Sequence, residues 1–187
     1  IENLSANMVQ YGFRVKSSKG RGGIVENIHV NMMNIDYASI AAIQFTTAYE
    51  NSFIKGVGAI PLFRNITVED MTVGKTDRSI EISGLVEQPI IDTTFKNIKI
   101  SSKWGTQIEE ADHITFDTIA AVPTKGTVFD ITDSANLTFK NIKCPLVRKD
   151  CITITDAASH NIDIQASGFT KDSVTFSGEA SDNALTQ

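Results

Sequence analysis

Apolar and polar residues alternate along most of the chain, in short segments separated by turn residues. Such pairs of apolar residues two positions apart are Ile98 and Ile100, Ile114 and Phe116, Leu137 and Phe139, and Ile162 and Ile164. A period of two is what a β-strand with one buried face produces. No window of useful length has the three- and four-residue apolar spacing of an amphipathic helix. The pattern therefore predicts an all-β protein.

The strand pattern repeats along the chain. Apolar anchors at Ile82, Ile108, Ile131, Ile154 and Phe176 are 26, 23, 23 and 22 residues apart. Asn-Ile or Asn-Leu also recurs, with the asparagine at positions 27, 65, 97, 136, 141 and 161. Repeats of this length built from strands predict a parallel β-helix, in which each coil stacks its apolar residues on the next. A leucine-rich repeat has a similar period, but its Leu-rich consensus is absent. We expect a single segment over residues 1–187, with about seven coils.

Two intervals between anchors exceed one period, so loops are predicted to project from the coils there. These intervals run from Val15 to Ile43 and from Ile43 to Ile82. The longest candidate loop is TTAYENSFIKGVGA, residues 46–59. Loops on one face of a solenoid commonly form its binding site, so this segment is a candidate for one.

Composition narrows the function classes. The 187 residues carry a net charge of -5, which argues against a general nucleic-acid binder, since such proteins are usually basic. No apolar run approaches the roughly 20 residues of a membrane helix, and residues 1–15 lack the pattern of a signal peptide.

Six residues separate Cys144 from Cys151. We expect two unpaired thiols here rather than a disulfide, and no metal site.

The segment GFRVKSSKGRGG, residues 12–23, is a strongly basic island in this acidic chain. Arg14, Lys16, Lys19 and Arg21 place four cations within eight residues, with no acid among them. Residues 14 and 16 leave a strand on the same face, with Val15 pointing into the coil between them. The glycines that follow are expected to form a tight turn. The cations either bind an anionic ligand or merely offset nearby acids.

Several segments in order resemble glycoside hydrolase family 28, the polygalacturonase family of right-handed parallel β-helices. The matching segments are GFRVKSSKGRGGIVENI, with the family's Arg-x-Lys; AIQFTTAYE, with its tyrosine strand; and the later coils PLFRNITVEDMTV, SIEISGLVEQPIIDTTFKNIKI and KGTVFDITDSANLTFKNI. The resemblance extends from about Ile1 to Gly178.

The resemblance implies a substrate and a set of contacts. The substrate would be a pectic polysaccharide or an oligogalacturonide, hydrolysed with inversion by paired carboxyl groups. Arg14 and Lys16 would bind the sugar carboxylate near the scissile bond, and Tyr49 would help to position that sugar. The resemblance implies no metal and no organic cofactor. The acidic charge and the lack of a long apolar run predict no nucleic-acid or membrane partner. Because pectin is extracellular, we expect an extracellular or periplasmic location.

The family's catalytic segments are missing from this sequence. Its Asn-Thr-Asp, Asp-Asp and Gly-His-Gly segments precede the Arg-x-Lys coil. We therefore expect the C-terminal part of a longer β-helix, with no catalytic residue in residues 1–187 and no hydrolase activity in this chain alone. Upstream coils or a partner chain should cover the N-terminal end at Ile1, Leu4 and Val9.

The acids that are present make poor substitutes for the missing ones. Glu109 and Glu110 are neighbours on a predicted strand, so their side chains should point to opposite faces. Asp133 and Asp156 recur at the coil period and are expected to be structural. Two other classes stay open: a non-catalytic carbohydrate-binding β-helix, and a Ca²⁺-dependent pectate-lyase-like enzyme, whose acids would hold the ion.

Overall fold

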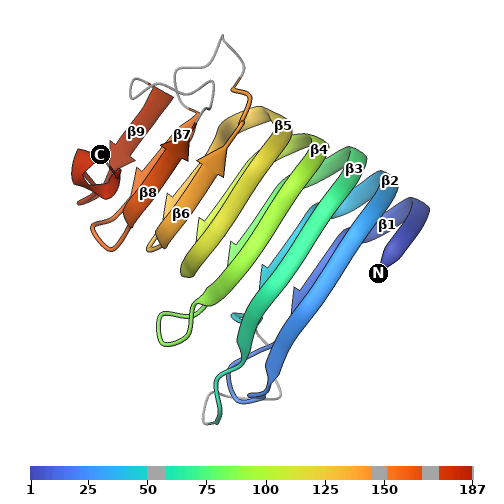
Figure 1. The fold of residues 1–187 in the computed structure, drawn as a ribbon, viewed down its shortest axis with the longest axis horizontal. Helices are drawn as coiled ribbons and strands as arrows, with labels where there is room; N and C mark the ends of the chain where they lie inside the picture. Colours follow the sequence, from blue (N-terminus) through green and yellow to red (C-terminus); the bar gives the residue numbers. More distant parts are fainter. Residues whose placement is uncertain (50–57, 145–150, 166–172, 187) are drawn as a thin grey trace.

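The chain winds into one sheet of parallel strands, shown in Figure 1 from the N-terminal to the C-terminal end. The computed structural model describes residues 1–49, 58–144, 151–165 and 173–186. In these ranges the elements are β1 (Glu2–Lys16), β2 (Ile24–Thr46), β3 (Leu62–Ser83), β4 (Ile90–Glu109), β5 (Ala111–Thr132), β6 (Ala135–Lys140), β7 (Ile152–Thr155), β8 (His160–Gln165), β9 (Val174–Ser177) and the short 3-10 helix η2 (Asp182–Ala184). No helix within them has the length and apolar character needed to cross a membrane.

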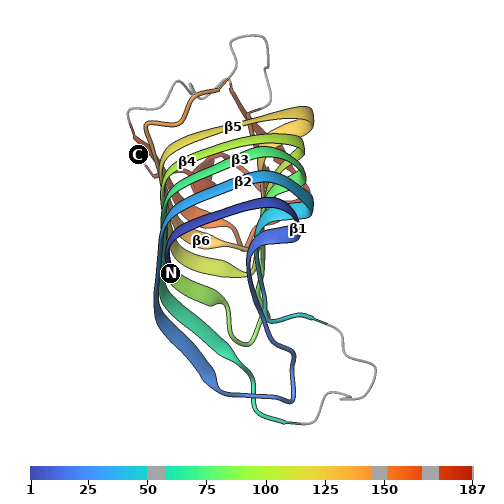
Figure 2. The same ribbon diagram turned by 90° about the vertical axis from the view of Figure 1, so that its right-hand side faces the viewer.

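The long strands bend around a common axis, so the sheet closes into a coil rather than lying flat. Figure 2 shows this bending in β1 to β5. Each pairing between consecutive levels is parallel, which confirms the predicted parallel β-helix. On one face the described strands β1, β2, β3, β4, β5, β7 and β9 stack in seven levels, in agreement with the predicted coil number.

The apolar anchors of the repeat stack directly on one another. Ile82 lies opposite Ile108, Ile108 opposite Ile131, Ile131 opposite Ile154, and Ile154 opposite Phe176. The four isoleucines are fully buried. The spacing of 22–26 residues read from the sequence is therefore the length of one coil.

The recurring asparagine of the Asn-Ile motif lies at corners of the coils. All six asparagines have left-handed φ angles between 50° and 59°: Asn27, Asn65, Asn97, Asn136, Asn141 and Asn161. Asparagine is among the few non-glycine residues that tolerate this conformation. Their amides also bond between coils, as in Asn136 to Asp112 at 2.7 Å and Asn161 to Asn136 at 3.0 Å. The motif thus turns the chain and links corners of neighbouring coils.

Stacked phenylalanines fill much of the coil interior. The rings of Phe45, Phe95, Phe116 and Phe139 follow one another at centroid distances of 5.7, 5.1 and 5.2 Å. Phe129 packs edge-on against Phe116 and Phe139. All five are fully buried, and burial of one such side chain contributes about 1.5–3 kcal/mol. The ladder joins coils that are far apart in sequence.

The expectation of unpaired thiols is wrong, because Cys144 and Cys151 form a disulfide with a Cα–Cα distance of 6.1 Å. Cys144 lies shortly after β6, and Cys151 immediately precedes β7. The stacking of these strands onto β5 brings the two ends of their connection together. Sequence spacing alone does not show that the two ends of this connection lie close together, so the disulfide was not predicted.

The outer edge of β1 leaves apolar side chains exposed. Ile1, Leu4 and Met8 have 60%, 38% and 76% of their surface accessible, whereas Val9 is partly buried. Only β2 pairs with β1 among the described strands. That an upstream coil or a partner chain covers this edge stays a prediction.

Candidate functional site

Two cations and two aromatic rings gather where β1 ends, and we call these residues, Tyr11, Arg14, Lys16 and Tyr49, the cationic site. The guanidinium carbon of Arg14 lies 4.1 Å from the ring centroid of Tyr11 and 5.2 Å from that of Tyr49. The Nζ of Lys16 lies 4.2 Å from the Tyr49 ring. The structure therefore brings together the three residues singled out from the sequence.

Backbone hydrogen bonds hold Tyr49 against the end of β1. The Ser17 amide donates to the Thr46 carbonyl at 2.8 Å, and the Tyr49 amide donates to the Ser17 carbonyl at 3.2 Å. These bonds fix the start of the predicted loop 46–59 beside Arg14 and Lys16. Residues 50–57 of that loop lie outside the described residues.

The glycine-rich segment after Lys16 forms the predicted tight turn. Gly20, Gly22 and Gly23 all have positive φ angles, of 96°, 61° and 83°. A Cβ added to Gly22 would lie 2.6 Å from the Cβ of Ala59, so a larger residue would push the turn away from the end of the loop. The turn therefore needs glycine both for its backbone conformation and for this close contact.

Three cations of the basic segment, Arg14, Lys16 and Lys19, differ in whether an acid neutralises them. Lys19 donates to the carboxylate of Glu87, which lies on the surface, and this bond lowers the pKa of Glu87. Among the described residues neither Arg14 nor Lys16 has an acidic partner. Charge compensation thus accounts for Lys19 and leaves the charges of Arg14 and Lys16 available to a ligand.

The cationic site also contains polar atoms whose hydrogen-bonding capacity the described residues leave unused. The Nε of Arg14 is buried and finds no hydrogen-bond partner among them. The same holds for the side-chain oxygen of Gln44, which lies opposite Arg14 in the sheet. Buried polar groups without partners are uncommon in native proteins. The two atoms thus leave hydrogen-bonding capacity unused next to the cationic site.

Three of the acids singled out from the sequence, Glu110, Asp133 and Asp156, lie at turns of the backbone. β4 ends at Glu109, and Glu110 has a left-handed φ of 50°, so the two do not alternate along one strand as predicted. Partial burial raises the pKa of Glu110, as do the charges of Asp133, Glu109 and Glu87. Asp133 and Asp156 also have left-handed φ angles, 46° and 67°, as suits structural turn residues.

In the described ranges, no three acids, histidines or cysteines form a group that could hold a metal ion.

Sequence reasoning missed Tyr11 as part of the cationic site. Tyr11 is three residues from Arg14, so simple strand alternation would place their side chains on opposite faces. From Tyr11 to Arg14 the pairing of β1 with β2 keeps one register, so simple alternation does not account for the contact. The guanidinium of Arg14 nevertheless reaches the Tyr11 ring, and no signal in the sequence indicates this contact.

The fold and the site define a class of protein, a parallel β-helix with an open cationic site on one face. No family model matches the chain. The chain is similar to an endo-polygalacturonase from Pectobacterium parmentieri, with 27% identity over 113 residues. The alignment covers 60% of this chain and 27% of that protein, so the chain spans about a quarter of the relative's length.

Proposed function

We propose that this chain supplies a substrate-binding wall of a polygalacturonase-like glycoside hydrolase that acts on pectic polyuronates outside the cytoplasm. The observation that carries the proposal is the cationic site, where Arg14 and Lys16 lie beside Tyr49 with no acidic partner among the described residues. The similarity to an endo-polygalacturonase supports the substrate class.

The side chains of the cationic site suit a galacturonate unit. The planar guanidinium of Arg14 presents parallel N–H donors that match the two oxygens of a carboxylate, and Lys16 adds a compact charge. Tyr49 offers a hydroxyl and a ring beside them, and 36% of its surface is exposed. Tyr11 stacks under the guanidinium and limits its freedom. The cations also attract a polyanion locally, although the whole chain is acidic.

Hydrolysis itself needs two further carboxyl groups. In an inverting enzyme one acid protonates the leaving oxygen, and a carboxylate on the opposite side activates water. We propose that coils preceding Ile1 in the full-length protein supply them. The role of Arg14 and Lys16 is then to hold the sugar next to the scissile bond in a fixed orientation, which favours reaction by positioning.

Two lysines three residues apart provide a matched test of this proposal. Replacing Lys16 with alanine should weaken the binding of hexagalacturonate by about five- to tenfold, because a charge-assisted contact is lost. Replacing Lys19 with alanine should change the affinity by less than about twofold, because Lys19 is already bonded to Glu87. Isothermal titration calorimetry on both variants measures the difference.

Each lysine variant needs a thermal melt to show that it folds like the wild type. Equal losses of affinity in the two variants would indicate general charge attraction and not a site. No measurable binding by the folded wild-type chain would reject the proposed function.

A further inference from the structure

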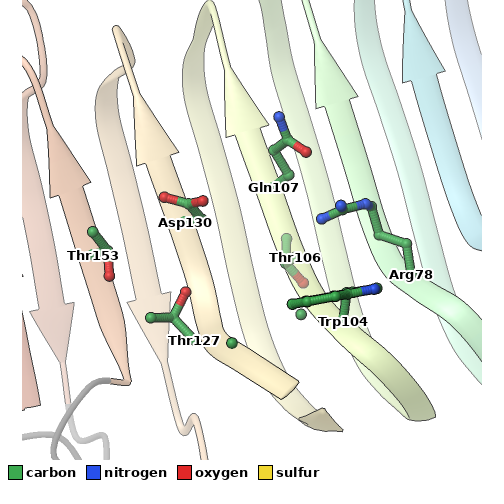
Figure 3. Close-up of a pocket in the computed structure, with 9 residues that line it drawn as sticks. Arg78, Trp104, Thr106, Gln107, Thr127, Asp130 and Thr153 are labelled. Carbon is green, nitrogen blue, oxygen red and sulfur yellow. The ribbon is translucent and has the colours of Figure 1, made fainter. Parts of the chain in front are cut away.

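A second polar pocket opens on the same face of the solenoid, farther toward the C-terminal end. It holds a volume of about 400 Å³. Figure 3 shows Trp104 and Gln107 from β4, Arg78 from β3 and Asp130 from β5 around it. We call these four residues the Trp104 pocket. None of them is part of the cationic site.

The strand register places the Trp104 pocket and the cationic site in line. Gln44, Glu81, Gln107 and Asp130 follow Arg14 in one row across successive strands. A neighbouring row leads from Tyr11 through Ala41 and Arg78 to Trp104. β1 and β4 are three strand spacings apart, which corresponds to about 14 Å. A linear ligand lying across the strands can therefore reach both sites.

The Trp104 pocket repeats the chemistry of the cationic site. In each, an aromatic residue lies beside an arginine: the Tyr11 ring contacts the guanidinium of Arg14, and Trp104 is the strand neighbour of Arg78. The Nζ of Lys125 also lies 5.8 Å from the Trp104 ring. Arg78 forms no salt bridge with the described residues, although its charge acts on Asp130 in the same pocket. Its guanidinium can still bind a carboxylate, as proposed for Arg14.

The remaining side chains suit the rest of a sugar. Trp104 exposes 40% of its surface, and its electron-rich ring face attracts the weakly positive C–H bonds on one face of a pyranose. Gln107 and Asp130 offer acceptors for hydroxyl groups. Desolvation by the pocket walls raises the pKa of Asp130, and the nearby Arg78 partly opposes that rise.

We infer that the Trp104 pocket is a second sugar-binding subsite, which takes another uronate unit of the oligomer held at the cationic site. Trp104 stacks on the sugar ring, Arg78 binds its carboxylate, and Gln107 and Asp130 accept hydrogen bonds from its hydroxyls. The ligand class rests on the proposed function. The location rests on the pocket and on its alignment with Arg14.

The chain carries its own probe of this subsite, because Trp104 is its single tryptophan. Titrating the wild type with hexagalacturonate should change the intensity or the wavelength of tryptophan fluorescence. The ligand concentration at half of this change should agree with the dissociation constant from calorimetry. Replacing Arg78 with alanine should weaken binding by at least about fivefold and remove most of the fluorescence change. Arg64 is the matched control, since it lies on the same strand but is paired with Glu26 at 2.6 Å. Replacing Arg64 with alanine should leave both readouts unchanged.

The two readouts separate failure of this inference from failure of the proposed function. Calorimetric binding of the wild type without any fluorescence change would overturn the subsite and leave the cationic site standing. Equal effects of the Arg78 and Arg64 variants, both folded by thermal melting, would overturn it as well. A fluorescence response that survives Arg14→Ala at higher ligand concentration would support a separate subsite. Absence of both signals in the wild type would reject both proposals.

Discussion

Replacing Arg14 with alanine is expected to weaken hexagalacturonate binding by roughly 30-fold, which corresponds to about 2 kcal/mol. Arg14 is half-buried between Tyr11 and Tyr49, and its Nε has no hydrogen-bond partner among the described residues. A charged contact in such a partly desolvated position contributes more than one on an open surface. Calorimetric titration of the variant and the wild type gives the ratio of affinities.

Arg14→Lys separates geometry from charge. Lysine keeps the positive charge but loses the planar pair of donors, so we expect it to recover only a small part of the affinity. Full recovery by lysine would show that charge alone matters at this position. An alanine variant that binds like the wild type would remove Arg14 from the site altogether.

The largest effect on stability is expected for Phe116→Ala, which should cost about 3–5 kcal/mol. Phe116 is fully buried and stacks between Phe95 and Phe139 at 5.1 and 5.2 Å, with Phe129 against its edge. Its removal leaves a cavity in the middle of the solenoid, where each coil depends on its neighbours. The loss is measured by urea denaturation, and the melting temperature should fall by roughly 10 °C.

Phe176→Ala is the control for the ladder. Phe176 stacks on Ile154 in the last described level and is only partly buried, so its loss should cost less than half as much. If the two variants were equally unstable, the cost would follow from removing any phenylalanine and not from the position in the ladder.

Much of the fold follows from residues that the sequence displays directly. The isoleucines at 82, 108, 131 and 154 predict the coil length because stacked coils must align their apolar residues, and the structure aligns them. The role of the Asn-Ile motif was not predicted. Its asparagines resemble ordinary strand residues in the sequence, whereas their left-handed φ angles make them the corners. The disulfide was not predicted because it depends on how β6 and β7 both stack on β5, which the spacing of the two cysteines does not show.

The candidate site was predictable only where adjacent residues carry it. Arg14 and Lys16 share one strand, so their common face follows from their spacing, and Tyr49 came from the family resemblance. Tyr11 was missed because residues three apart on a strand are expected on opposite faces, whereas its ring contacts the guanidinium of Arg14. The Trp104 pocket joins three different strands, so its composition depends on the register of the whole sheet. Nothing in the sequence near Trp104 indicates that alignment.

The central claim is that the cationic site recognises the carboxylate of a uronate. Its most direct test compares hexagalacturonate with the same oligomer fully methyl-esterified, titrated into the wild-type chain by calorimetry. Esterification removes the negative charge and leaves the sugar ring and its linkage unchanged. We predict saturable binding of the acid form, weakened by added salt, and at least about a tenfold loss of affinity for the ester. Equal affinity for the two oligomers would contradict the claim.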